Sequence, residues 1–148
     1  MECLQSVKIL ATLGGTVSLR FVSVNAREDA HLHGGAVDLS VLKQSDVQVL
    51  RLRGRLTLGQ PVDAFRHALE EGFENGDTRF LVNLAEVPMV DSSGIGVLVR
   101  CQASARQRGG NIKLVQPQDY TVKTLKMVGL LDLFDIYESE EDAVASFS

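Results

Sequence analysis

The chain of 148 residues lacks most of the features that mark membrane, disulfide-rich or nucleic-acid-binding proteins. It has only two cysteines, Cys3 and Cys101, and their wide separation gives neither a disulfide framework nor a metal-ligand spacing, so we expect a protein of the reducing cytoplasm. No run approaches the roughly 18 consecutive apolar residues of a membrane-spanning helix. Lysine and arginine form no cluster, and the net charge of −4 argues against direct binding to nucleic acid.

The residues needed for common catalytic sites are also scarce. There are three histidines, His31, His33 and His67, and none lies in a metal-ligand or hydrolase pattern. The serines near residue 92 are not in the Gly-x-Ser-x-Gly turn of hydrolases. Gly94-Ile95-Gly96 begins a dinucleotide-binding fingerprint but lacks its third glycine, and the chain has no Gly-x-x-x-x-Gly-Lys-Ser/Thr loop. We therefore predict no enzymatic activity, no bound metal and no cofactor.

Residues 1–36 differ in character from the rest of the chain. The apolar run 9–19, followed by the small residues 24–26, has the outline of an export signal. Gly14-Gly15 breaks this run and Arg20 interrupts it before the cleavage-like site, so we favour a poorly ordered extension over an export signal.

From residue 37 onward, the pattern predicts one α/β domain, 37–148. Period-two alternation and short apolar runs indicate strands, spacings of three and four indicate helices, and Gly, Asn and Pro mark their ends. The expected strands are 37–42, 47–52, 80–84, 112–115 and a short one within 131–137. The expected helices are 61–73, 94–108, 117–129 and 140–147. This alternation requires a sheet covered by helices.

The most informative segment is 91–96, Asp-Ser-Ser-Gly-Ile-Gly, where a buried strand leads into a helix. A helix start offers unpaired backbone N–H groups and the positive end of the helix dipole, so a phosphate on Ser92 or Ser93 would be tolerated there. Helix capping alone explains one of these polar residues. The segment, however, has two hydroxyls where one cap would suffice, and the apolar residues Ile95 and Val99 lie nearby. This combination favours a surface that binds a partner and can be phosphorylated. The simpler alternative for Ile95 is that another element covers it.

These segments resemble the STAS domain, most closely that of the bacterial anti-sigma factor antagonists. The resemblance covers residues 37–148 and rests on the segments 54–56, 80–84, 90–98, 109–114 and 128–130. It implies a single domain of the α/β class, with a mixed β-sheet of about four to five strands packed against about four helices.

The resemblance also implies a regulatory activity. In this family the serine after the aspartate, here Ser92, is phosphorylated by a partner serine kinase that is also the anti-sigma factor. The unphosphorylated form binds that kinase and releases the sigma factor, and a phosphatase resets the system. By this likeness Asp91 orients or helps to activate the acceptor hydroxyl. The remaining implied roles are the shaping of the helix start by Ser93 and Gly94, and contact with the partner by Ile95, Leu125 and, from the helix pattern, Val99.

Two other hypotheses stay open at this point. One is a STAS adaptor that does not switch, in a signalling scaffold or a lipid-transport complex. The other is a nucleotide-binding module. Ser92 beside an intact Asp91 and Gly94 favours the antagonist, because an adaptor needs no acceptor serine. The chain departs from many family members at 54–57, where Gly-Arg-Leu-Thr replaces Gly-Glu-Leu-Asp.

Overall fold

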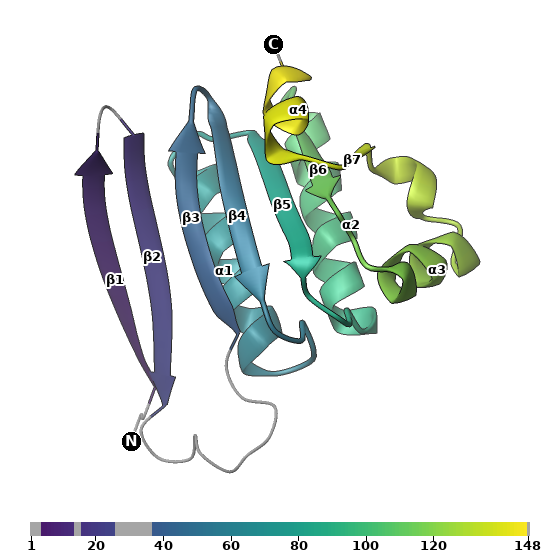
Figure 1. Cartoon of the computed structure of the whole chain (residues 1–148), viewed down its shortest axis with the longest axis horizontal. Helices are drawn as coiled ribbons and strands as arrows, with labels where there is room; N and C mark the ends of the chain where they lie inside the picture. Colours follow the sequence, from purple (N-terminus) through teal and green to yellow (C-terminus); the bar gives the residue numbers. More distant parts are fainter. Residues whose placement is uncertain (1–3, 14–15, 26–36, 148) are drawn as a thin grey trace.

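The computed structural model describes residues 4–13, 16–25 and 37–147 (Figure 1). One sheet holds the seven described strands in the order β1 to β7. The strands are β1 Leu4–Leu13, β2 Thr16–Asn25, β3 Asp38–Gln44, β4 Val47–Arg53, β5 Arg79–Glu86, β6 Asn111–Val115 and β7 Ile136–Tyr137. The helices are α1 Gln60–Glu74, α2 Ser92–Gln107, α3 Asp119–Met127 and α4 Glu140–Ala145, with a 3₁₀ turn, η1, at Leu131–Leu133.

The sheet is mixed, as the resemblance implied. Strands β1 to β4 pair as antiparallel neighbours, whereas β4 to β7 pair in parallel. The five strands within residues 37–147 agree with the predicted four to five. For the extension we expected poor order, but the backbone of 4–13 and 16–25 forms two strands, and β2 pairs with β3. The rest of that expectation, at residues 1–3, 14–15 and 26–36, lies outside the described residues.

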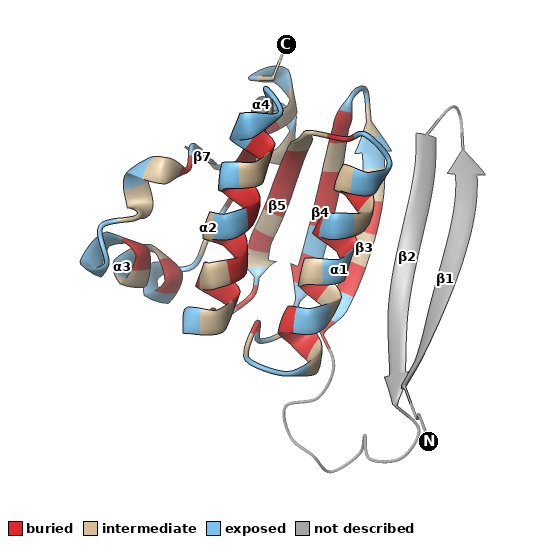
Figure 2. Ribbon diagram, turned by 180° about the vertical axis from the view of Figure 1, so that it is seen from behind, coloured by how far each residue is buried: buried red, intermediate tan, exposed pale blue. Residues whose placement is uncertain are grey.

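Helices α1 and α2 cover one face of the sheet (Figure 2). The predicted helix face of α1 is buried there, with Phe65 and Leu69 fully enclosed, and Leu98 of α2 packs into the same core. Each helix follows the carboxyl end of one strand and returns to its parallel neighbour, so α1 and α2 run in the same direction. This arrangement places the start of α2 at the end of the sheet where β4 and β5 finish (Figure 1).

The short helix α4 covers part of the other face. Its Ala143 joins Val49, Leu81 and Val115 in a second, smaller core. The helix is also fastened by polar contacts, because Arg51 donates two hydrogen bonds to Glu140, at 2.8 and 2.7 Å.

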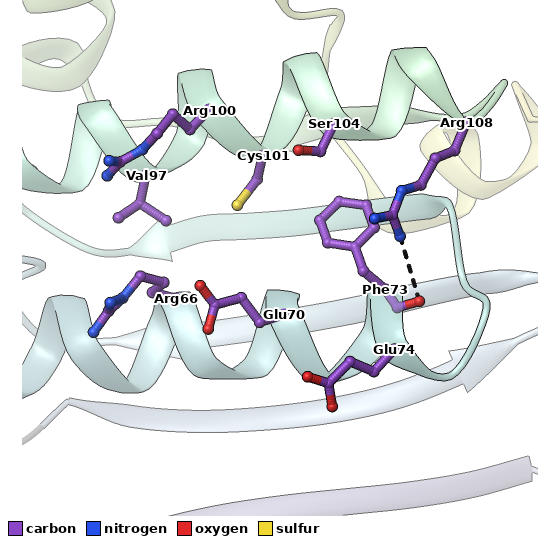
Figure 3. A pocket seen from close by; sticks show the side chains of 9 residues that line it. All are labelled: Arg66, Glu70, Phe73, Glu74, Val97, Arg100, Cys101, Ser104 and Arg108. Carbon is purple, nitrogen blue, oxygen red and sulfur yellow. Dashed lines mark hydrogen bonds between the residues drawn. The ribbon is translucent and has the colours of Figure 1, made fainter.

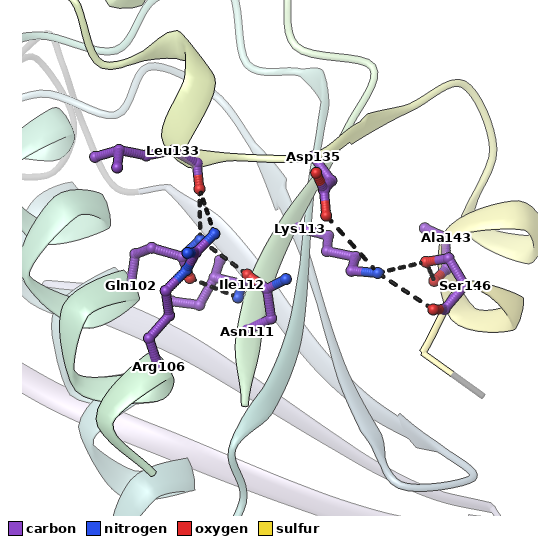
Figure 4. A network of polar contacts seen from close by, with 9 residues as sticks. All are labelled: Gln102, Arg106, Asn111, Ile112, Lys113, Leu133, Asp135, Ala143 and Ser146. Carbon is purple, nitrogen blue, oxygen red and sulfur yellow. Dashed lines mark hydrogen bonds and ion pairs between the residues drawn. The ribbon is translucent and has the colours of Figure 1, made fainter. Parts of the chain in front are cut away.

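A polar network joins α2 to the last third of the chain (Figure 4). Gln102 is almost fully buried, and its amide donates to the side chain of Asn111 and to the carbonyl of Leu133. Its side-chain oxygen accepts from the backbone N–H of Ile112 at 2.7 Å. The short strand expected within 131–137 is present as β7, and the 3₁₀ turn at 131–133 precedes it. The Leu133 carbonyl at the end of this turn is the one that Gln102 holds.

Candidate phosphorylation site

The site is built where two loops meet at the carboxyl end of the sheet. Beyond β4 and β5, a single parallel bridge joins Leu56 to Val90. The Leu56 N–H donates to the Met89 carbonyl at 2.9 Å, and the Asp91 N–H donates to the Leu56 carbonyl at 3.2 Å. The loop that leads into α1 is therefore fastened beside the residue that starts α2.

Asp91 is the N-cap of α2. Its Oδ1 accepts from the backbone N–H groups of Ser93 and Gly94, at 3.0 and 3.1 Å, and from the Ser93 hydroxyl at 2.6 Å. Its Oδ2 accepts from the backbone N–H of Leu58 at 2.9 Å. The carboxylate therefore binds the helix through one oxygen and the neighbouring loop through the other.

These hydrogen bonds keep Asp91 ionised. Partial burial is the largest single influence and opposes ionisation, but the donors from Ser93, Leu58 and Gly94 together outweigh it and lower the pKa of the carboxyl. A lowered pKa means that the cap is charged throughout the physiological range. Its stabilising effect is present above the unfolded-state pKa of about 3.9 and is lost only as the pH falls through the lower native value.

The two serines have different environments. Ser92, the first helical residue, is exposed, and no described residue makes a hydrogen bond to its side chain. Ser93 is half-buried, and its hydroxyl is held by Asp91. The sequence left open which polar residue is the cap, and the structure assigns that role to Asp91. It also shows that the first-turn N–H groups of Ser93 and Gly94 are already occupied by Asp91, rather than free for a phosphate.

Gly94 is required by close packing. A Cβ at this position would lie 2.7 Å from Cγ1 of Val90 and 3.1 Å from the carbonyl oxygen of Leu56. The absence of a side chain therefore lets α2 start directly against the bridge between the two loops. Gly96 has no such neighbour, since a Cβ there would meet nothing within 4 Å.

The structure corrects two of the predicted partner contacts. Ile95 is only 6% exposed and Leu125 is fully buried, and both belong to the main core. The simpler interpretation of Ile95 is therefore the right one, and neither side chain is available to a partner. Val99, seven residues after Ser92 and so on the same side of α2, is half-buried.

Sequence reasoning missed an exposed apolar residue whose backbone is hydrogen-bonded to Asp91. Leu58 is 78% exposed although its backbone is held by Asp91. The available signal was an apolar residue next to Gly59 in a connector, outside any helix or strand period.

The sequence also matches a known protein family. A model of the STAS domain matches residues 38–143. The chain belongs to the STAS domain family. In the described part of this STAS protein, no helix is long and apolar enough to cross a membrane, and no group of His, Cys, Asp and Glu side chains could hold a metal ion.

Among its relatives is an "Anti-sigma F factor antagonist" of Paenibacillus polymyxa, 27% identical over 99 residues, which covers 66% of this chain and 84% of the relative. A solved anti-sigma factor antagonist from Mycobacterium paratuberculosis has a TM-score of 0.68 at 18% identity, over 76% of this chain and 94% of that one. The Bacillus cell fate determinant SpoIIAA, solved in its phosphorylated form, has a TM-score of 0.63 at 21% identity, over 74% of this chain and 99% of that one. These structural similarities establish the fold.

Proposed function

We propose that this protein is a cytoplasmic anti-sigma factor antagonist that acts by partner switching at Ser92. The unphosphorylated chain binds an anti-sigma factor that is also a serine kinase, which frees the sigma factor. Phosphorylation of Ser92 ends this binding, and a phosphatase restores the binding form. The similarity to a curated relative that carries the antagonist name supports this assignment.

The observation that carries the proposal is that Asp91, and not Ser92, caps the start of α2. Asp91 supplies the cap, and it also takes the hydroxyl of Ser93, so neither role falls to Ser92. Ser92 is left as an exposed hydroxyl in the first turn of α2, whose backbone is capped by Asp91. An acceptor serine needs this combination, because a kinase must reach the hydroxyl while the backbone stays ordered.

The charge balance at the site supports release on phosphorylation. A phosphoserine adds about −1.5 to −2 charges at pH 7, next to the ionised carboxylate of Asp91. The exposed Leu58 and half-buried Val99 lie on the surface that we assign to the partner. Burying the added charge there costs desolvation and repulsion, and a loss of about 2–3 kcal/mol would weaken binding roughly 30- to 150-fold. No change of fold is needed.

The test is phosphosite mapping by mass spectrometry on protein isolated from its own cells, in growing and in stressed cultures. Trypsin releases Ser92 and Ser93 in one peptide, Phe80–Arg100, and the fragment ions between the two serines assign the phosphate. We expect phosphate on Ser92 at a level that changes with stress.

The control is the Ser92→Ala variant expressed in the same cells, which should lose this phosphopeptide. Absence of phosphate from Ser92 in every condition, with the wild-type peptide detected, would contradict partner switching. The non-switching STAS adaptor would then be the better assignment.

A further inference from the structure

A groove runs between α1 and α2 on the helical face of the molecule (Figure 3). It has a volume of about 570 Å³. Its floor is formed by Val97 and Cys101, both buried, with the half-buried Phe73 towards one end. This size and a partly apolar floor are typical of a binding surface rather than of a packing defect.

The two walls of the groove carry opposite charge. On the α1 side, the charged lining residues are Arg66, Glu70 and Glu74, and Arg66 is neutralised by its ion pair with Asp63 at 3.0 Å. The α1 wall is therefore acidic. On the α2 side, the charged lining residues are Arg100 and Arg108, so this wall is basic.

The walls do not neutralise each other within one molecule. No ion pair joins α1 to α2 among the described residues, although Glu70 and Arg100 line facing sides of the groove (Figure 3). Arg108 instead stacks over the ring of Phe73, with its guanidinium 4.8 Å from the ring centre. The acidic and the basic wall are both available to something that enters or covers the groove.

We propose that this face pairs with the same face of a second copy of the chain. Since α1 and α2 run in the same direction, a two-fold axis along the groove places α1 of one copy over α2 of the other. The acidic wall then meets the basic wall twice, and Glu70 of each copy comes within reach of Arg100 of the other. A surface that carries both halves of such a pair is self-complementary, as a two-fold interface requires.

The pairing does not depend on the proposed switch. Arg100 lies eight residues after Ser92, about 12 Å along the helix, so the start of α2 stays at the edge of the paired faces. Because the contact is made mainly of exposed charges over a small apolar floor, it belongs to the weak, salt-sensitive class of interfaces.

Sedimentation velocity of the full chain tests the proposal. Wild-type protein should shift towards twice the monomer mass as its concentration rises to about 0.5 mM. The shift should disappear between about 0.1 M and about 1 M salt, where the screening length falls from about 10 to about 3 Å. Glu70→Arg and Arg100→Glu should each abolish association, because each places two like charges at the contact between positions 70 and 100. The double variant E70R/R100E should associate again.

Two controls keep the result specific. Each variant should retain the wild-type melting curve, which separates loss of pairing from loss of folding. Glu141→Arg changes the same charge on α4, on the opposite face of the sheet, and should leave association unchanged. The proposal is overturned if wild-type protein stays monomeric throughout, if Glu141→Arg is as disruptive as Glu70→Arg, or if the double variant fails to recover.

Discussion

The backbone N–H of Leu58 lies 2.9 Å from Oδ2 of Asp91, so the cap of α2 also holds the loop that follows β4. Its other oxygen accepts three donors from the first turn of the helix. One carboxylate thus sets the geometry on both sides of Ser92. This explains how an exposed serine can stand on ordered backbone without contributing to the order itself.

Replacement of the cap, Asp91, should lower the stability of the fold, whereas replacement of the proposed acceptor, Ser92, should not. Asp91→Ala leaves the N–H groups of Ser93, Gly94 and Leu58 without their acceptor, and we expect a loss of about 2 kcal/mol in the free energy of unfolding, the upper end for an N-cap. Ser92→Ala removes no described hydrogen bond and should cost less than about 1 kcal/mol. Urea denaturation of both variants measures the difference. An equal loss in the two variants would mean that Ser92 is structural.

Replacing Gly94 and Gly96 by alanine should change the stability of the fold in opposite directions. Gly94→Ala forces a Cβ to within 2.7 Å of Val90 and should destabilise the fold by about 1–3 kcal/mol. Gly96→Ala places its Cβ in open space, and alanine is the better helix former, so stability should rise by about 0.5–1 kcal/mol. Thermal unfolding of the pair tests this. Similar melting temperatures would show that the start of α2 can move away from Leu56.

An acidic substitution of the exposed leucine should block the partner without harming the fold. Leu58→Asp puts a second negative charge beside Asp91 on the proposed docking surface, and its side chain is 78% exposed. We expect at least tenfold weaker binding to the kinase proposed to phosphorylate Ser92, about 1.4 kcal/mol. Titration calorimetry with that kinase is the measurement, and Ala145→Asp on the exposed side of α4 is the control. Unchanged binding would remove Leu58 from the interface.

The sequence was sufficient for the order of the elements in residues 37–147, because periodicity and turn residues are local signals. Exposure at the site depends on which element covers which, and no local signal carries that information. Ile95 lies on the flank of the predicted helix face, and only the assembled fold shows that it is part of the core. Leu125 was placed on the surface by likeness to other proteins, yet it is fully buried.

The choice of cap also needed the structure. Asp, Ser and Ser are all good N-caps, so the sequence could not rank Asp91 above Ser92. The hydrogen bond from the Leu58 N–H to Asp91 joins residues 33 positions apart, and the local patterns of a single sequence do not predict contacts at that separation. The sequence did indicate that there are more polar groups at this helix start than a cap needs. In the structure Asp91 is the cap, and the Ser92 hydroxyl makes no hydrogen bond to a described residue.

The docking of α4 should depend on pH through Glu140. The hydrogen bond from Arg51 is the main cause that lowers the pKa of this carboxyl, and Asn83 adds a second donor, against a smaller opposing effect of burial. Because the native pKa is lowered, the stabilisation is fully present above the unfolded value of about 4.3 and is lost as the pH falls through the native one. Urea titrations should therefore show a gap between wild type and Glu140→Gln that closes below about pH 4. Glu141→Gln, which removes an exposed carboxylate of the same helix, is the control.

The buried thiol in the groove should react slowly. Burial is the main cause that raises the pKa of Cys101 to about 11, and the charge of Glu70 adds to it. At pH 8 only about one thiol in a thousand is then ionised, and the thiolate is the form that reacts with iodoacetamide. Alkylation of the tryptic peptide Cys101–Arg106 should be slow in native protein and fast in urea. Glu70→Gln should increase the native rate, because it removes a negative charge that disfavours the thiolate, whereas Glu141→Gln on α4 should not. A native rate equal to that in urea would show that the groove opens far enough to bring Cys101 into water.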